Sequence, residues 1–143
     1  MNRRNLQALS DERVRDAQAL LNAGQWSAAY YLVGYAVECA LKSCVLHHIE
    51  KTGELFSEPK YLKMLGNCWT HDLDFLVQLA RLEKDFGQAQ AANVALAQNW
   101  IEAKKWSETS RYTLATTETD ARELFLAITH DPDGVLPWIR TFW

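Results

Sequence analysis

The feature that most constrains the fold is the segment 26–49, which contains no proline and one glycine, Gly34. Apolar and small residues recur along it at the spacing of one helix face: Ala29, Leu32, Val33, Ala36, Val37, Ala40, Cys44 and Val45. Its other side carries Tyr31, Tyr35, Glu38, Lys42 and Leu46. A helix that is apolar around most of its circumference is surrounded by partners. The pattern therefore predicts a long central helix that is buried by other helices, or that also forms an interface.

Four further segments have helical periodicity, at 11–23, 71–86, 88–106 and 118–129. Ser10, Thr70 and Thr117 are placed to cap the first, second and fourth of these segments, and Asp120 completes a capping box with Thr117. The three prolines all lie outside the periodic segments. The sequence thus predicts an all-α antiparallel bundle of about five main helices in one domain, 1–143. Residues 131–143 are expected to form an apolar C-terminal tail.

Composition narrows the class of protein. The formal net charge of −3 and the pI of about 5.8 give no support for a simple phosphate-coating protein, which would be basic. Cys39, Cys44 and Cys68 form no CxxC pair and are interpreted as buried thiols in a reducing, cytoplasmic compartment. No apolar stretch suggests a signal sequence or a membrane span. No metal or cofactor motif is present, and the adjacent His47 and His48 point about 100° apart on a helix.

Three segments occur in an order that is typical of one protein family. They are AVECALK at 36–42, THDLDFL at 70–76 and WSETSRY at 106–112. Together they resemble the HEPN domain, a family of helical bundles that is associated with nucleotides or RNA, over roughly residues 17–128. The resemblance implies a nucleotide- or RNA-binding module of the kind found in toxin–antitoxin systems. It also implies a homodimer, or a partner such as a nucleotidyltransferase-like or antitoxin protein.

The resemblance implies a site between two protomers that is lined by Glu38, Lys42, Arg111 and Tyr112. Active ribonucleases of this family carry an Arg followed by a His about five to seven positions later. Here Arg111 is followed by YTLATTE, which contains no His, and Arg122 and His130 are too far apart. Enzyme activity is therefore left open. A divergent metal-independent ribonuclease is one alternative, in which His71 replaces the missing His, and a purely structural interaction module is another.

Each candidate residue has a structural and a functional interpretation. Glu38 and Lys42 form an i, i+4 pair, either as a plain salt bridge or with Glu38 in a pocket beside Arg111 and His71. His71 serves the start of a helix, or binds anions, or transfers protons. The Arg111 guanidinium suits a phosphate bidentately, but it equally suits Glu38 or loop carbonyls. Tyr112 either stacks on a base or packs locally.

A dimer is also predicted from apolar side chains that one small core would not hide. They lie on the second face of the long helix (Tyr31, Tyr35 and Leu46) and in the tail (Trp138, Ile139, Phe142 and Trp143). Large exposed apolar patches mark sites where proteins associate. The expected interface is therefore formed by the central helix, by the tail, or by both.

Overall fold

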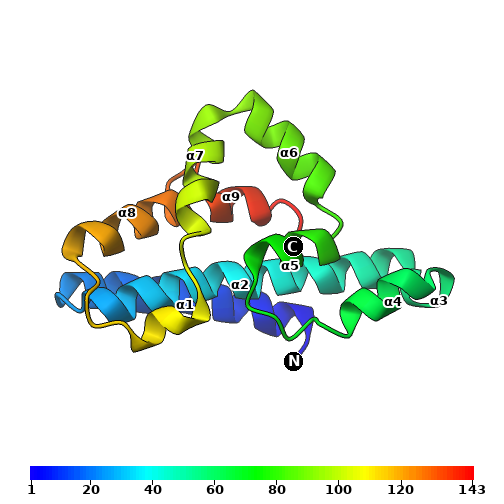
Figure 1. Ribbon diagram of the computed structural model, residues 1–143, viewed down its shortest axis with the longest axis horizontal. Coiled ribbons are helices and arrows are strands. Elements are labelled where there is room, and N and C mark those ends of the chain that lie inside the picture. Colours follow the sequence, from blue (N-terminus) through cyan, green and yellow to red (C-terminus); the bar gives the residue numbers. More distant parts are fainter.

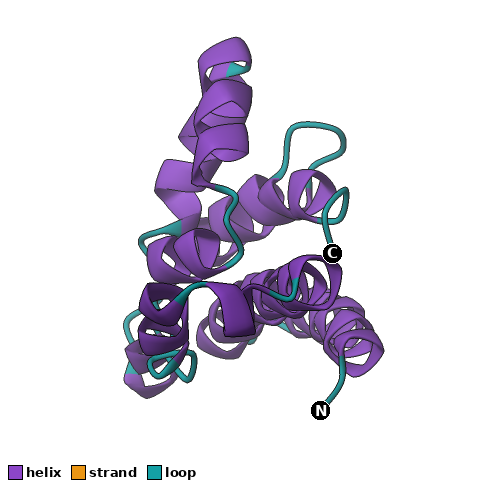
Figure 2. Ribbon diagram, turned by 90° about the vertical axis from the view of Figure 1, so that its right-hand side faces the viewer, coloured by secondary structure: helices purple, strands orange, loops and turns teal.

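The computed structural model describes residues 1–143 and contains helices and connecting loops but no strand (Figure 2). The predicted all-α class is thereby confirmed. Helices α1 (Arg3–Asn22) and α2 (Trp26–Thr52) lie side by side along the longest dimension of the molecule (Figure 1). The remaining elements are α3 (Glu54–Ser57), α4 (Pro59–Leu65), α5 (Leu73–Leu79), α6 (Glu83–Ala92), α7 (Val94–Ala103), the 3₁₀ helix η1 (Glu108–Tyr112), α8 (Glu118–Thr129) and α9 (Val135–Ile139).

Helix α2 is the central helix, as its sequence pattern predicted. It packs against α1, α5, α8, α9 and η1. Of the predicted inward residues all are buried except Leu32, which is half-buried. By length and composition alone α2 could cross a membrane, which differs from the sequence expectation, but 67% of its apolar window is buried inside the protein. Packing against the other helices therefore accounts for its apolar character.

Helix α1 begins eight residues earlier than the segment 11–23 predicted, since it starts at Arg3 rather than Asp11. Its N-cap is Asn2, whose side chain accepts a hydrogen bond from the backbone N–H of Asn5. Ser10 was predicted to be the cap but lies inside the helix. Its buried Oγ donates to the carbonyl of Ala36 at 2.7 Å. The first turns of α1 are held by tertiary contacts with α2, which a local capping pattern does not report.

The segments predicted as two long helices, 71–86 and 88–106, are three shorter ones. Helix α5 begins after Asp72, whose side chain accepts from the N–H of Phe75, so that Thr70 is not the N-cap. The chain then turns at Arg81, which has a left-handed φ of 58°. A second break falls at Asn93, which caps α7. Neither break contains glycine or proline. The apolar periodicity of the sequence also continues across both breaks, so the sequence gives no sign of them.

Residues 131–143, which were predicted as an apolar C-terminal tail, contain α9, and this helix packs into the core. Val135, Leu136 and Ile139 of α9 are completely buried in the same core as α2 and α5. Trp138 stacks on Phe86 with ring centroids 4.2 Å apart. Because these residues fill the core, they do not supply the exposed apolar patch from which a dimer was predicted. Phe142 and Trp143 are half-buried.

The cysteines are free thiols, and Cys39 and Cys44 are buried, as the sequence interpretation required. Burial raises the pKa of Cys44 to about 12 and that of Cys39 to about 11. The third, Cys68, is half-buried in the connection after α4. At neutral pH Cys39 and Cys44 are therefore protonated and act as small apolar side chains rather than nucleophiles.

Candidate functional site

A buried carboxylate lies at the middle of α2. The Glu38 side chain is 1% exposed, and both of its oxygens have a partner. Oε1 accepts from Lys42 Nζ at 2.7 Å, one helical turn further along α2. Oε2 lies 2.9 Å from His71 Nδ1. Burying an unpaired carboxylate is very costly, so this pairing explains how Glu38 is tolerated in the core.

His71 is positioned by the connection that leads into α5. The adjoining Thr70 Oγ1 accepts from the N–H of Asp72, and Asp72 in turn caps α5. These local contacts fix the backbone at His71, and its imidazole lies against Glu38 of α2. Glu38, Lys42 and His71 thus lie together in the structure, as predicted, although His71 is 33 positions from Glu38 in the sequence.

The contact with Glu38 determines which nitrogen of His71 carries a proton. A carboxylate paired with an ammonium group can only accept, so Nδ1 must be the donor. In the neutral imidazole, Nε2 then has the free lone pair and is a proton acceptor. The His71 side chain is 42% exposed and lines an open cavity of about 380 Å³. The arrangement therefore presents an oriented base to solvent.

The rest of the cavity lining comes from the connection after α7 and from the first residue of η1. These segments contribute Lys104, Trp106, Ser107 and Glu108. Lys104 lies 3.5 Å from Asp74, at the edge of the same cavity. The lining thus combines carboxylates and hydroxyls, which can accept hydrogen bonds, with the His71 imidazole and the Lys104 ammonium. Such acceptors suit ribose hydroxyls and the amino groups of bases more than they suit a phosphate.

Trp106 fixes the connection before η1 against the central helix. Its indole is buried and Nε1 donates to the carbonyl of Tyr31 at 3.1 Å. A Cβ at position 34 would overlap the indole ring, so the absence of a side chain at Gly34 allows this close approach. Tyr31 stacks between Trp106 and Tyr35, with ring centroids 6.1 Å from each. Sequence analysis missed this role of Gly34 and Trp106.

Arg111 and Tyr112 lie together at the end of η1 and are separate from the Glu38 pair. The Arg111 guanidinium lies over the Tyr112 ring, 4.8 Å from its centroid. It forms no ion pair, and Glu38 has Lys42 and His71 as partners instead. The nearby Tyr112 and Tyr31 hydroxyls raise the pKa of Arg111, so its charge is permanent. The predicted pocket of Glu38, His71 and Arg111 is therefore divided into two adjoining parts.

The two parts are linked by η1. Ser107 caps η1, and Glu108 lines the His71 cavity, with Arg111 one 3₁₀ turn further along. Tyr112 is 73% exposed and Leu114, just beyond η1, is 97% exposed. Arg111 and Tyr112 do not line the cavity themselves, but they lie on the same short helix as Glu108 and offer an unpaired cation and an accessible ring. No three His, Cys, Asp or Glu side chains come together as metal ligands.

Comparisons with protein-family models, with curated proteins and with solved structures found no match to this chain. The interpretation of the site therefore depends on its own geometry and chemistry.

Proposed function

We propose that the chain is a nucleotide- or RNA-binding module that uses the face formed by η1 and the start of α5. Arg111 would contact a phosphate, Tyr112 would stack on a base, and the cavity at His71 would receive a ribose or base. The resemblance of 36–42, 70–76 and 106–112 to HEPN segments points to the same ligand class.

The main support for the proposal is that the Arg111 guanidinium has no carboxylate partner. Most of the arginines of this chain are paired with carboxylates, whereas Arg111 has none and lies over an exposed ring. A guanidinium fork binds phosphate in two-point geometry, and a tyrosine ring stacks on any base. An acidic protein can bind RNA in this way if the contact is local rather than spread over a basic surface.

Fluorescence anisotropy with a labelled single-stranded RNA tests the proposal. We expect Arg111→Ala to weaken binding about tenfold, a loss of roughly 1.4 kcal/mol. It should also reduce the slope of log K against log salt by about 0.7, which is the share of one phosphate contact on a single strand. Arg15→Ala is the matched control, because Arg15 is exposed and unpaired on α1. Equal binding by the wild type and both variants would remove Arg111 from the ligand contact.

The Glu38–His71 geometry favours a second candidate, a metal-independent ribonuclease. An imidazole that donates through Nδ1 to a buried carboxylate is held in one tautomer, with Nε2 free to take a proton. In this reaction Nε2 removes the proton of a ribose 2′-hydroxyl, and the 2′-oxygen attacks the adjacent phosphorus. The 5′-oxygen leaves and takes a proton from water. Arg111 would stabilise the charge on the phosphoryl oxygens.

Cleavage of structured and unstructured RNA in EDTA separates the two candidates. The ribonuclease hypothesis expects weak cleavage that falls at least about a hundredfold in His71→Ala, the usual contribution of one acid–base group. His130→Ala is a suitable control because it removes an exposed imidazole at the end of α8, outside the cavity. Robust cleavage that neither His71→Ala nor Arg111→Ala changes would exclude this site. No cleavage, with binding that depends on Arg111, would favour the binding module.

We also propose that the module acts as a homodimer, on grounds that differ from the sequence prediction. The apolar tail is buried, but the side chains of Trp69, Tyr112 and Leu114 are all more than 70% exposed. Sedimentation equilibrium at micromolar concentration should give about twice the chain mass. A monomer at that concentration would exclude the homodimer and leave a different protein as partner.

A further inference from the structure

A second cavity, of about 350 Å³, lies at the C-terminal end of α2 and shares no residue with the cavity at His71. Its polar lining includes His47, His48, Lys51 and Arg81, and its apolar lining includes Phe142 and Trp143. These residues come from α2, from the turn between α5 and α6, and from the segment after α9. The proposed nucleotide-binding face uses none of them.

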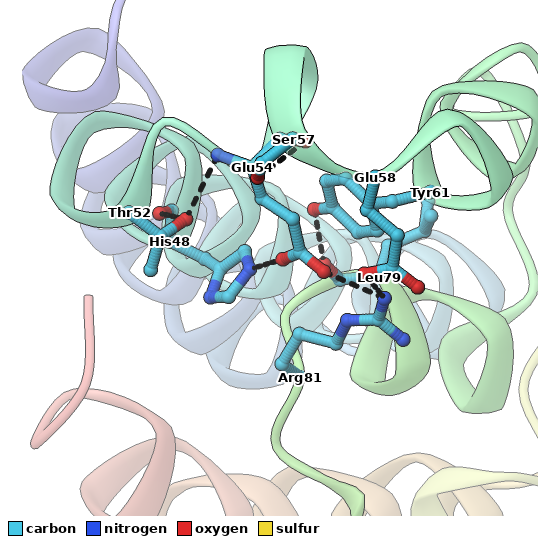
Figure 3. A network of polar contacts seen from close by, with 8 residues as sticks. All are labelled: His48, Thr52, Glu54, Ser57, Glu58, Tyr61, Leu79 and Arg81. Carbon is cyan, nitrogen blue, oxygen red and sulfur yellow. Dashed lines mark hydrogen bonds and ion pairs between the residues drawn. The ribbon is translucent and has the colours of Figure 1, made fainter.

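Arg81 is held rigidly at the edge of this cavity. Its Nη2 donates to Glu54 at 2.8 Å and to Glu58 at 3.0 Å, as Figure 3 shows. The guanidinium also lies 4.7 Å from the centroid of the buried Tyr61 ring. All the ion-pair contacts use Nη2, so Nε and Nη1 keep their hydrogens for another acceptor. The backbone of Arg81 has a φ of 58°, a conformation that disfavours a residue with a side chain.

The two histidines are fixed as donors by their neighbours. His47 Nδ1 contacts the Arg3 guanidinium, which can only donate, so Nδ1 accepts and the proton lies on Nε2. His48 Nε2 contacts Glu54, and the Arg81 guanidinium is the main cause that lowers the pKa of this carboxyl to about 2. Glu54 is therefore ionised and His48 Nε2 must donate to it (Figure 3). His47 retains an N–H with no partner.

Among the charged side chains that line the cavity, hydrogen-bond donors outnumber acceptors. Lys51 is exposed and forms no ion pair, so its ammonium is available. Asp85 is the one carboxylate that lines the cavity. The hydroxyl of Thr141 already donates to the carbonyl of Trp138. His47, Lys51 and Arg81, each with a donor that has no partner, thus line the same cavity as the aromatic side chains of Phe142 and Trp143.

We propose that this cavity binds a small anion with a flat apolar body, whose carboxylate or phosphate accepts from Lys51, His47 and Arg81. The body would lie against Phe142 and Trp143. A volume of about 350 Å³ is at the lower end of the range for small-molecule sites, about 300–1,000 Å³. The ligand is therefore of mononucleotide size or smaller, and this site is distinct from the RNA-binding face in both place and ligand.

Isothermal titration of the full chain with four probes tests this site. AMP supplies a phosphate with a flat body, indole-3-acetate a carboxylate with a flat body, inorganic phosphate the anion alone, and adenosine the body alone. We expect AMP or indole-3-acetate to bind at least about tenfold more tightly than inorganic phosphate or adenosine. The better of the two decides between phosphate and carboxylate. No saturable binding of either at millimolar concentration would overturn the proposal.

Lys51→Ala should weaken binding of the better probe at least about tenfold, and Lys51→Arg should restore most of it. Lys60→Ala is the matched control, because Lys60 is an exposed, unpaired lysine on α4 outside the cavity. Arg81→Gly, which suits the left-handed backbone, should also weaken binding. Arg111→Ala should leave it unchanged. Binding that Arg111→Ala weakens and Lys51→Ala does not would place the ligand in the His71–Arg111 face and contradict the proposal.

Discussion

Two clusters of charged side chains lie along α2, and each joins a histidine to a carboxylate and a permanent cation. In the middle of the helix the carboxylate of Glu38 is at the centre and is 1% exposed. Beyond the C-terminal end of the helix the guanidinium of Arg81 is at the centre. Its side chain is 30% exposed, and those of Glu54 and Glu58 are 15% and 43% exposed.

The difference in burial indicates in which cluster the loss of one ion-pair partner destabilises the fold more. Water can solvate Arg81, Glu54 and Glu58 if one of them is removed, so each pair adds little to stability. Water cannot reach Glu38 without disturbing the packing of α2. The Glu38 cluster is therefore expected to couple stability to the orientation of His71, whereas the Arg81 cluster clamps α3 and α4 onto the end of α2.

The largest expected effect follows removal of the ammonium beside Glu38. Lys42→Met should destabilise the chain by about 3 kcal/mol, because a buried carboxylate then loses its charged partner. Urea denaturation would measure it. Lys104→Met is the control, since its pair with Asp74 is exposed and should cost less than about 0.5 kcal/mol. Similar losses in the two variants would contradict the distinction between the clusters.

A smaller effect is expected from glycines next to each cluster. Gly34→Ala should cost about 2 kcal/mol, because a Cβ there overlaps the buried Trp106 ring that walls the His71 cavity. Gly53→Ala should cost about 1 kcal/mol, because its φ is 63° although nothing lies near its Cβ. Thermal or urea unfolding would rank the two, and RNA binding should weaken in Gly34→Ala only. A larger loss in Gly53→Ala would show that the Trp106 contact adapts.

Removal of the Arg81 side chain should destabilise the chain less than Gly34→Ala and about as much as Gly53→Ala. Arg81→Ala is expected to cost about 1 kcal/mol, since its pairs with Glu54 and Glu58 are partly exposed. Arg81→Gly should be less destabilising than Arg81→Ala, because glycine accepts the left-handed backbone. Urea midpoints of the two variants give the comparison. A loss as large as that of Lys42→Met would mean that burial does not distinguish the clusters.

A further prediction concerns the pH dependence of the Arg81 cluster. The folded pKa of Glu54 is about 2, below its unfolded value of about 4.3, so its contribution to stability is present above the unfolded pKa. That contribution is lost as the pH falls from about 4.3 towards 2. The difference in unfolding free energy between wild type and Glu54→Gln should therefore shrink over that range. A difference that stays constant from pH 6 to pH 2.5 would show that the ion pairs do not stabilise the fold.

The local sequence pattern predicted the boundaries of some helices and missed those of others. Helices α2 and α8 were predicted closely because their apolar periodicity and flanking residues end where the helices do. The breaks at Arg81 and Asn93 were missed because neither residue interrupts the apolar periodicity. The start of α1 was missed because its first turns are stabilised by α2.

The site was predicted in the same uneven way. Glu38 and Lys42 were paired correctly from their helical spacing, and the functional interpretation of Glu38 correctly placed His71 beside it. The same interpretation placed Arg111 in this pocket, but the partners of Glu38 are Lys42 and His71, and Arg111 lies over Tyr112 instead. Trp106 and Gly34 were missed as a pair, because a ring that fits against a glycine 72 positions away leaves no local signal.

The most direct test of nucleotide or RNA binding at the face formed by η1 and the start of α5 is an NMR titration. Isotope-labelled protein is titrated with a short single-stranded RNA. We expect the largest shift changes in the His71 ring and in the backbone of Thr70, Ser107 and Arg111. The His47 ring, in the other cavity, should change little. Shift changes centred on His47 and Lys51, or no saturable change at millimolar RNA, would exclude RNA binding at the face formed by η1 and the start of α5.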